Sequence, residues 1–156
     1  MNAKTGSGSR ILVVGTSGSG KTMLVRNLAK KLGIKDIELD ALFWKENWPQ
    51  SEPAEFGEKI TKEIAGADGY VIHGNYNKAK DLTWGNVDTV IWLDYRRIVV
   101  LWRALKRTIT RIITKEELWS GNRETFFNSS LAKDSIVAWA WNIYRKLKEQ
   151  YSLMIQ

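Results

Sequence analysis

Apolar residues fall along this chain into short continuous runs and into longer segments with a helical period. A continuous run is typical of a central strand in a parallel sheet, and the longer period is typical of a helix with one apolar face. The two kinds largely alternate, which predicts an α/β fold with a parallel sheet and helices on both of its faces. The predicted strands cover residues 10–14, 36–39, 70–72 and 87–93, and the predicted helices cover residues 20–32, 51–64, 97–114 and 134–151.

Aromatic residues add to this picture, because the chain has eight tryptophans and a predicted aromatic loop at residues 41–50. Trp92 lies in a predicted strand, and Trp102 lies on the apolar face of the predicted helix at residues 97–114, so both are expected in the core. Trp44 and Trp48 lie in the loop instead, and they are the candidates for stacking on a ligand.

The length of 156 residues predicts one domain, covering residues 10–156 after a flexible leader at residues 1–9. The chain has no cysteine and a single histidine, His73, which excludes disulfides and thiolate metal sites. It has no apolar run of transmembrane length, and its first residues lack a signal-peptide core. A cytoplasmic protein without a membrane partner is therefore expected, and the oligomeric state is left open.

The net charge of +7 is unevenly spread, because residues 96–115 contain seven basic residues and no acidic one. Such a basic stripe suits a polyanion, either the phosphates of a nucleotide or a nucleic acid. A solvated helix face would carry the same charges. Arg103, Arg107 and Arg111 are spaced four residues apart and therefore share one face of the predicted helix.

The main candidate chemistry follows the first predicted strand, where residues 15–22 fit the Gly-x-x-x-x-Gly-Lys-Thr pattern of the phosphate-binding P-loop. Glycines let the backbone wrap around phosphates, and the following helix directs its positive N-terminal end at the same anion. Lys21 is expected to reach the β- and γ-phosphates, and the Thr22 hydroxyl is expected to ligate Mg²⁺. The predicted nucleotide-binding residues are Gly15, Ser17, Gly18, Ser19, Gly20, Lys21, Thr22 and Met23.

Other classes of P-loop or nucleotide-binding protein need features that the sequence lacks. A small GTPase needs an Asp-x-x-Gly switch, and no aspartate here is followed three residues later by glycine. An AAA-type motor would need an extra helical subdomain, for which the chain is too short. A Rossmann dinucleotide site is disfavoured because no third glycine follows Gly20 at the required spacing. The layout of a small-molecule kinase remains, with an acceptor-binding segment after the second strand and an arginine-bearing helix and lid after the fourth.

The P-loop and four further segments, at residues 38–48, 71–76, 88–97 and 121–139, occur in the order found in one bacterial family. In these segments the chain resembles the P-loop proteins known as topology modulation or adenylate-kinase-like proteins, of the nucleoside and nucleotide kinase superfamily. The resemblance implies a three-layer, nucleotide-kinase-like P-loop fold that binds ATP with Mg²⁺. It supplies no phosphate acceptor, and it leaves open whether ATP or GTP is preferred.

Two features depart from that family's pattern. The position of His73 is usually acidic in these relatives and helps to hold Mg²⁺ through water, and a histidine cannot supply that negative charge. We therefore expect either that Asp40 or Asp94 takes the metal-facing role or that activity is reduced. Relatives also continue into a fifth strand and a further helix, whereas this chain ends at Gln156. A sheet of four to five strands, truncated at the fifth, is expected.

The residues expected to carry catalysis are Lys21, Asp40, Arg107 and Arg123. Asp40 closes the second predicted strand, at the sheet edge where open α/β folds bind ligands. Its carboxylate could accept the proton of an acceptor hydroxyl or hold a Mg²⁺-bound water. Arg107 is the expected phosphate clamp, and Arg123 is the expected lid residue. The alternatives are a helix- or turn-capping role for Asp40 and a local ion pair of Arg123 with Glu124 or Glu116.

Together these residues favour a Mg²⁺-dependent, ATP-binding kinase that transfers the γ-phosphate to an unidentified acceptor. Its partners would be the nucleotide and that small molecule. The alternative is a regulatory or nucleic-acid-associated nucleotide-binding protein with little turnover, which would use the basic stripe on phosphates.

Overall fold

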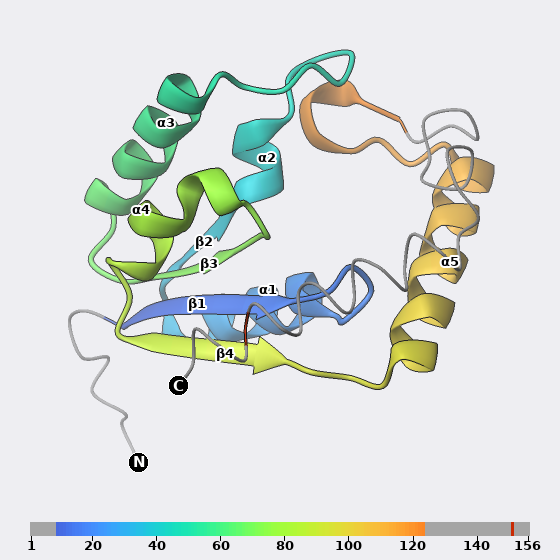
Figure 1. Cartoon of the computed structure of the whole chain (residues 1–156), viewed down its shortest axis with the longest axis horizontal. Helices are drawn as coiled ribbons and strands as arrows, with labels where there is room; N and C mark the ends of the chain where they lie inside the picture. The colour runs from blue at the N-terminus through green and yellow to red at the C-terminus, as the bar shows by residue number, and fades with distance from the viewer. Residues whose placement is uncertain (1–8, 124–150, 152–156) are drawn as a thin grey trace.

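The computed structural model describes residues 9–123 and residue 151. Its centre is a sheet in which every strand is parallel to its neighbours, in the order β2-β3-β1-β4 (Figure 1). The predicted α/β fold with a parallel sheet is therefore confirmed. The strands are β1 (Arg10–Gly15), β2 (Lys35–Glu38), β3 (Tyr70–His73) and β4 (Thr89–Leu93).

Helices connect the strands, and their ends follow local sequence signals. Gly33 ends the first helix in a left-handed conformation with φ of 67°, and Pro53 stands in the first turn of the third. The helices are α1 (Lys21–Leu32), α2 (Leu39–Phe43), α3 (Pro53–Ala65), α4 (Lys80–Trp84) and α5 (Arg97–Thr114), with single 3-10 turns η1 (Asn77–Ala79) and η2 (Trp119–Gly121).

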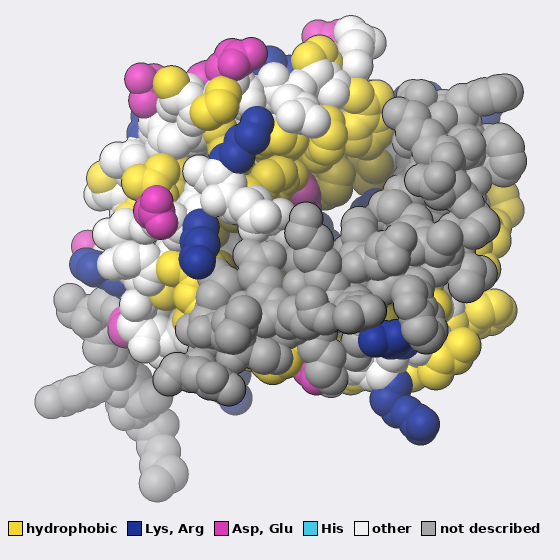
Figure 2. Space-filling view, in the orientation of Figure 1, with side chains coloured by type: hydrophobic (Ala, Val, Ile, Leu, Met, Phe, Trp, Pro, Cys, Tyr) yellow, Lys and Arg dark blue, Asp and Glu magenta, His cyan; other side chains and the backbone are white. Residues whose placement is uncertain are grey.

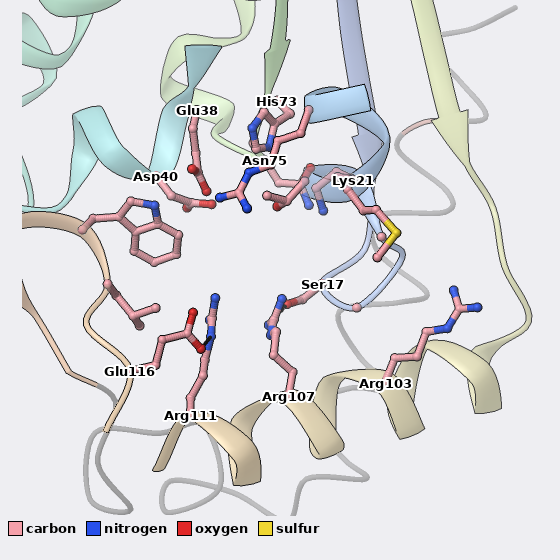
Figure 3. A pocket seen from close by; sticks show the side chains of 18 of the residues that line it. Ser17, Lys21, Glu38, Asp40, His73, Asn75, Arg103, Arg107, Arg111 and Glu116 are labelled. Atoms are coloured by element: carbon pink, nitrogen blue, oxygen red, sulfur yellow. Dashed lines mark hydrogen bonds and ion pairs between the residues drawn. The ribbon is translucent and has the colours of Figure 1, made fainter. Parts of the chain in front are cut away.

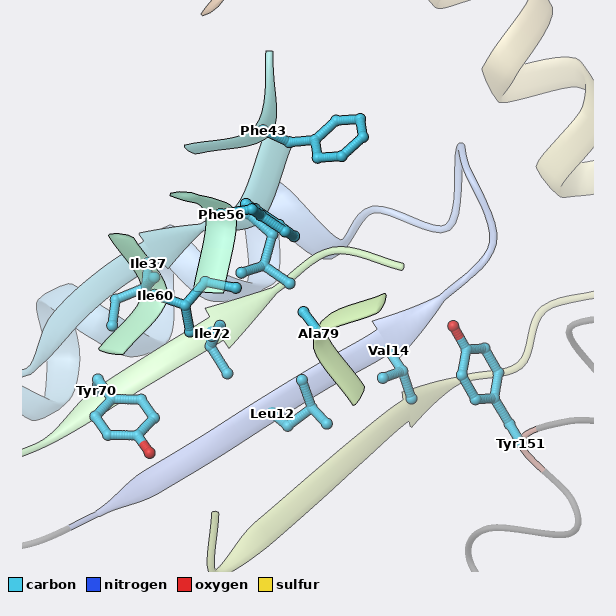
Figure 4. Packing of buried hydrophobic residues seen from close by; sticks show 11 residues of the cluster. Leu12, Val14, Ile37, Phe43, Phe56, Ile60, Tyr70, Ile72, Ala79 and Tyr151 are labelled. Atoms are coloured by element: carbon cyan, nitrogen blue, oxygen red, sulfur yellow. The ribbon is translucent and has the colours of Figure 1, made fainter. Parts of the chain in front are cut away.

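Side chains of β1 alternate between the two faces of the sheet, and each face is covered by different helices (Figure 1). Leu12 and Val14 belong to a core that includes buried residues of α2 and α3 (Figure 4). Ile11 and Val13 belong to a second core that α1 completes. β1 is thereby buried on both faces, which explains its continuous apolar run. The two cores give the three layers that the sequence predicts.

The second strand begins and ends one residue earlier than predicted, and a helix replaces the start of the predicted loop at residues 41–50. β2 ends at Glu38, so Asp40 lies in the first turn of α2 and does not close a strand. Leu39 and Phe43 are both buried, and their packing stabilises this single turn. One turn is too short to show a helical period in a sequence, so the pattern of apolar residues predicts neither α2 nor α4.

The helix α5 has the predicted bounds, but its apolar face is not in the core. Ile98, Trp102 and Ile113 have exposed fractions of 70%, 66% and 74%, and hydrophobic side chains colour the outer edge of the molecule at α5 (Figure 2). The core position predicted for Trp102 is therefore wrong. Trp92 is partly buried and packs against the core, as predicted.

Two of the sequence predictions fall almost wholly outside the described residues: the leader at residues 1–9 and the helix at residues 134–151. Tyr151 is described, and it is buried in the core, where its hydroxyl donates a 2.8 Å hydrogen bond to Asn75 Oδ1. Within the described ranges, none of the helices combines the length and the apolar character needed to cross a membrane.

Candidate active site

The P-loop connects β1 to α1 through a turn that depends on glycine. Gly18 and Gly20 have φ angles of 85° and 89°, which L side chains rarely adopt. A Cβ on Gly18 would also lie 2.6 Å from the carbonyl oxygen of Val100, so glycine lets α5 approach the loop. Among the described residues, no side chain caps the N-terminus of α1, and its first turn has no acidic residue. The N–H groups of that turn can therefore receive an anion.

Lys21 lies folded back over the loop. Its Nζ donates hydrogen bonds to the carbonyl oxygens of Gly15 (2.7 Å) and Thr16 (3.0 Å). Burial lowers the pKa of Lys21 to about 8, the Asp40 carboxylate acts in the opposite direction, and the Arg107 guanidinium lowers it further. A phosphate in the loop would favour the charged ammonium, so the lysine is suited to an anionic ligand.

A cavity of about 830 Å³ opens in front of the P-loop (Figure 3). The loop and the start of α1 form one wall, and residues after the carboxyl ends of β2 and β3 form the second. The third wall comes from α5 and residues 116–119. This is the sheet edge where open α/β folds bind ligands, and the volume suits a nucleotide-sized molecule.

Three arginines of α5 line this cavity from one helix face, as their spacing predicts. Arg107 reaches furthest toward the P-loop, and its Nη2 donates a 2.8 Å hydrogen bond to Ser17 Oγ. The Arg111 Nε lies 3.5 Å from Glu116 Oε2, and the Arg103 guanidinium carbon lies 5.1 Å from the centre of the Tyr95 ring. The middle arginine is therefore the one in direct contact with the phosphate loop.

Asp40 lines the same cavity from the side opposite Arg107 (Figure 3). Its Oδ1 accepts a 2.5 Å hydrogen bond from the hydroxyl of Tyr76, which follows β3. Burial and the neighbouring Asp40 charge raise the pKa of Tyr76, so the hydroxyl stays protonated and holds the carboxylate in place.

His73 ends β3 directly beside Glu38 of β2 and is only 2% exposed. Its Nε2 lies 3.3 Å from Asp36 Oδ1 but makes no hydrogen bond with a described residue. Burial lowers the pKa of His73, and this outweighs the opposite effect of Glu38, Asp36 and Asp40. The imidazole is therefore neutral and lies among carboxylates.

Replacing His73 by aspartate is expected to destabilise the fold by about 3 kcal/mol or more, because a buried carboxylate would lie beside three others. Thermal unfolding of His73→Asp and of the neutral control His73→Asn measures this, and a Mg²⁺ titration with nucleotide accompanies it. An unchanged melting temperature together with tighter Mg²⁺-dependent binding in His73→Asp would instead identify position 73 as metal-facing.

The cavity gathers most of the predicted site residues, including Asp40, Arg107 and Met23. Gly15 and Ser19 are buried and are not among its lining residues. The remaining P-loop residues of the prediction, which do line the cavity, are Ser17, Gly18, Gly20, Lys21 and Thr22.

Two predicted residues lie elsewhere. Asp94 is exposed just after β4 and does not line the cavity. Arg123 also lies outside the lining, and its Nη2 is 3.8 Å from Glu117 Oε2, an acid other than the Glu116 or Glu124 that was the alternative partner for this residue. The metal-facing role of Asp94 and the lid role of Arg123 remain predictions.

Several lining residues were not predicted as functional. Tyr76 and Asn75 follow β3 at the ligand-binding edge of the sheet, and the Asn75 Nδ2 donates a 2.7 Å hydrogen bond to the Gly15 carbonyl oxygen. Their position after a buried strand is the signal that could have found them. Trp119 also lines the cavity, whereas the predicted stacking residues Trp44 and Trp48 pack on each other, with ring centroids 5.5 Å apart.

Asn122 holds the wall that contains Trp119 in place. It is buried, its Oδ1 accepts a 3.0 Å hydrogen bond from the Trp48 N–H, and its Nδ2 donates a 2.8 Å bond to the Lys45 carbonyl oxygen. Ser120 Oγ adds a 2.8 Å bond to the Trp44 carbonyl oxygen. The segment after α5 is thereby fixed to the loop after α2.

The cavity also fits Mg²⁺ in its donor chemistry. Thr22 and Asp40 line it and supply hydroxyl and carboxylate oxygens, the ligands that this cation prefers. The described residues contain no group of three or more acidic or histidine side chains that would hold a metal by themselves. A cation here would therefore depend on the phosphates of a nucleotide for the rest of its ligands.

Comparison with known families identifies the nucleotide-binding segment. The model of the family described as "ATPase family associated with various cellular activities (AAA)" matches residues 11–94, more than half of the chain. The matched range runs from β1 to the end of β4 and includes the P-loop and Asp40. No curated protein matches the chain.

Solved structures add a similarity in fold. A candidate kinase from Chloroflexus aurantiacus j-10-fl has a TM-score of 0.53 at 14% identity, with 86% of this chain and 78% of that chain covered. A gluconokinase from Sinorhizobium meliloti 1021 is 24% identical, with 94% and 97% covered and a TM-score of 0.49. A sugar kinase from Janibacter sp. HTCC2649 is 17% identical, with 81% and 78% covered and a TM-score of 0.42. The first similarity supports the fold, and none assigns a substrate.

Proposed function

The chain belongs to the ATPase family associated with various cellular activities (AAA), and we propose that it is a Mg²⁺-dependent kinase of small molecules. In this proposal the P-loop binds ATP, and the γ-phosphate is transferred to a hydroxyl group of the acceptor. The nucleoside and nucleotide kinase superfamily, which the sequence resembles, is the proposed functional relative.

Family membership bears on the exclusion of an AAA-type motor, which was based on a chain too short for an extra helical subdomain. The match covers the segment from β1 to β4 that contains the P-loop and the sheet. The matched segment fits within this short chain, so the length of the chain does not exclude it from the family. The exclusion is therefore wrong at the level of the family.

One observation carries the kinase proposal: a carboxylate faces the phosphate-binding groups across a single cavity. Lys21 and Arg107 contact the P-loop, and Asp40 lies opposite them with its orientation fixed by Tyr76. An ATPase that only hydrolyses ATP needs a place for water, whereas this cavity has room for an acceptor beside the nucleotide.

The proposed reaction uses positioning and electrostatics, with little covalent work for the protein. Lys21 and the N–H groups at the start of α1 hold the phosphates, and Arg107 stabilises the charge on the transferred oxygens. The acceptor oxygen forms its bond to the γ-phosphorus as the bond from that phosphorus to the β-phosphate oxygen breaks. Asp40 takes the hydroxyl proton, and ADP leaves. Thr22 would hold Mg²⁺, which would neutralise phosphate charge. In the alternative role for Asp40, its carboxylate would hold a Mg²⁺-bound water instead of acting as the base.

A second candidate function rests on basic residues in and directly after α5 that do not line the cavity. Lys106 and Lys115 are exposed and could meet the phosphates of a nucleic acid. The affinity for a nucleic acid would fall steeply with salt: a plot of log K against log salt concentration would have a slope of about −0.9 for each phosphate contacted. The affinity for a nucleotide in the cavity would fall much less. The orientation of Arg107 toward the P-loop favours the kinase.

The proposal is tested by incubating the protein with ATP and Mg²⁺ and screening small acceptors by the release of ADP. Acceptor-dependent ADP release that Asp40→Asn lowers by roughly 10²-fold or more supports it, because the general base would be lost. The matched control is Asp81→Asn, which changes an exposed aspartate outside the cavity. ATP hydrolysis that no acceptor stimulates would contradict a kinase.

A further inference from the structure

The charged residues of the cavity are divided between two sides (Figure 3). Basic residues line the walls formed by α1 and α5: Lys21 and Arg26 of α1, and Arg103 and Arg107 of α5. Glu38 and Asp40 face them from the end of β2 and the start of α2. The nucleotide phosphates belong on the first side, so an acceptor must occupy the space beside the two carboxylates.

The remaining charges near that space are largely neutralised by one another. Arg111 lies 3.5 Å from Glu116, and Arg123 lies 3.8 Å from Glu117. Among the residues that the structure describes, five basic and four acidic side chains line the cavity. MgATP is itself a net anion, so a bound nucleotide offsets the small basic excess of these lining side chains. A second anion would meet like charges, which binding sites use to exclude wrong ligands.

A separate observation indicates what the acceptor offers. His73 lines the cavity, is 2% exposed, and its Nε2 makes no hydrogen bond with a described residue, although Asp36 Oδ1 is 3.3 Å away. A buried ring nitrogen without a hydrogen bond is costly until a ligand supplies one. A hydroxyl can donate to or accept from a neutral imidazole, and the neighbouring carboxylates accept from hydroxyl or ammonium groups.

We infer that the acceptor is an uncharged or cationic polyhydroxy compound, such as a sugar, an amino sugar or a nucleoside, and that its phosphorylated or carboxylated analogues are excluded. This inference rests on the proposed kinase function and narrows its substrate class. Glu38 is the specificity-determining residue, because it adds a carboxylate beside Asp40 that the transfer reaction itself does not need.

The test compares acceptors that differ in charge, using the full chain with ATP and Mg²⁺. The first set contains neutral glucose, cationic glucosamine, and the anions gluconate and glucose 6-phosphate. The second set contains neutral adenosine and its anionic analogue AMP. The ratio kcat/KM from ADP release is expected to favour neutral or amine members over their anionic analogues by about 100-fold. Preference for an anionic member overturns the inference. So does the absence of acceptor-dependent ADP release from all neutral and cationic members in a protein that binds ATP.

Substitution of Glu38 tests its role directly. Glu38→Gln is expected to lower the preference for a neutral acceptor over its anionic analogue, measured as the ratio of their kcat/KM values, by about tenfold. The substitution removes one charge that repels the anion. Glu58→Gln, an exposed acid on α3 outside the cavity, is expected to leave the difference unchanged. An unchanged difference in Glu38→Gln, with a wild-type melting temperature, overturns the assignment of Glu38.

Binding of ATP, measured by calorimetry without any acceptor, separates two kinds of failure. A protein that binds no ATP contradicts the kinase proposal as a whole. A protein that binds ATP and phosphorylates an anionic acceptor best leaves the kinase proposal intact and overturns only the acceptor class.

Discussion

Lys21→Ala is expected to weaken ATP binding by roughly 100-fold or more, because it removes the ammonium that would bind the β- and γ-phosphates in a partly desolvated loop. The folded state should survive. Among the described residues, the Lys21 side chain makes hydrogen bonds only to the carbonyl oxygens of Gly15 and Thr16. Isothermal titration with ATP and Mg²⁺ measures the affinity, and a thermal melt checks the fold.

Lys30→Ala is the matched control for this change. Lys30 is exposed in the last turn of the same helix, so its loss removes one positive charge without touching the loop. Its ATP affinity should stay within a factor of about two of the wild type, since an exposed distant charge is largely screened. Unchanged ATP affinity in a folded Lys21→Ala protein would overturn the P-loop interpretation and everything that depends on it.

The parts of the molecule that the sequence predicts well are those fixed by local rules. The run at residues 10–14 becomes the central strand because it is buried on both faces, and Gly33 ends α1 because it adopts positive φ there. The Gly-Lys-Thr end of the P-loop places Lys21 and Thr22 in the cavity for the same reason. In each case the chemistry is contained within a few consecutive residues.

The parts that the sequence predicts poorly depend on contacts between distant segments. Asn122 fixes Trp119 in the cavity wall through hydrogen bonds to Lys45 and Trp48, more than seventy residues away. No spacing rule connects these positions, so the tryptophan that lines the cavity differs from the two that the loop suggested. The core position predicted for Trp102 is wrong for a related reason, because the sequence of an apolar helix face does not show whether other parts of the fold cover that face.

Arginine placement shows the same division. The four-residue spacing puts Arg103, Arg107 and Arg111 on one helix face, and the structure confirms that this face lines the cavity. The spacing does not reveal which of them reaches the P-loop. The approach of α5 to the P-loop decides this. The backbone of Val100 lies against Gly18, and Arg107, about two turns further along α5, is then the arginine that contacts Ser17.

Arg107→Ala is accordingly expected to lower turnover by roughly 10³-fold while changing ATP affinity by less than about tenfold. The guanidinium contacts the P-loop at Ser17. In the proposed reaction it would stabilise the negative charge that spreads over the oxygens of the transferred phosphoryl group in the transition state. An interaction that strengthens in the transition state affects kcat more than binding. Steady-state ADP release with a working acceptor and calorimetric ATP binding measure the two effects separately.

Lys106→Ala provides the control on the same helix, since Lys106 is exposed and does not line the cavity. It should leave turnover and affinity near the wild-type values. Nucleic-acid binding makes the opposite prediction: the losses of Arg103, Arg107, Arg111 and Lys106 would then have comparable effects, and each would reduce the salt slope of binding by about one. Small and equal effects on turnover from all four substitutions would therefore refute the phosphate-clamp role of Arg107. A large effect on turnover from Arg107→Ala alone would support phosphoryl transfer as the function of this cavity.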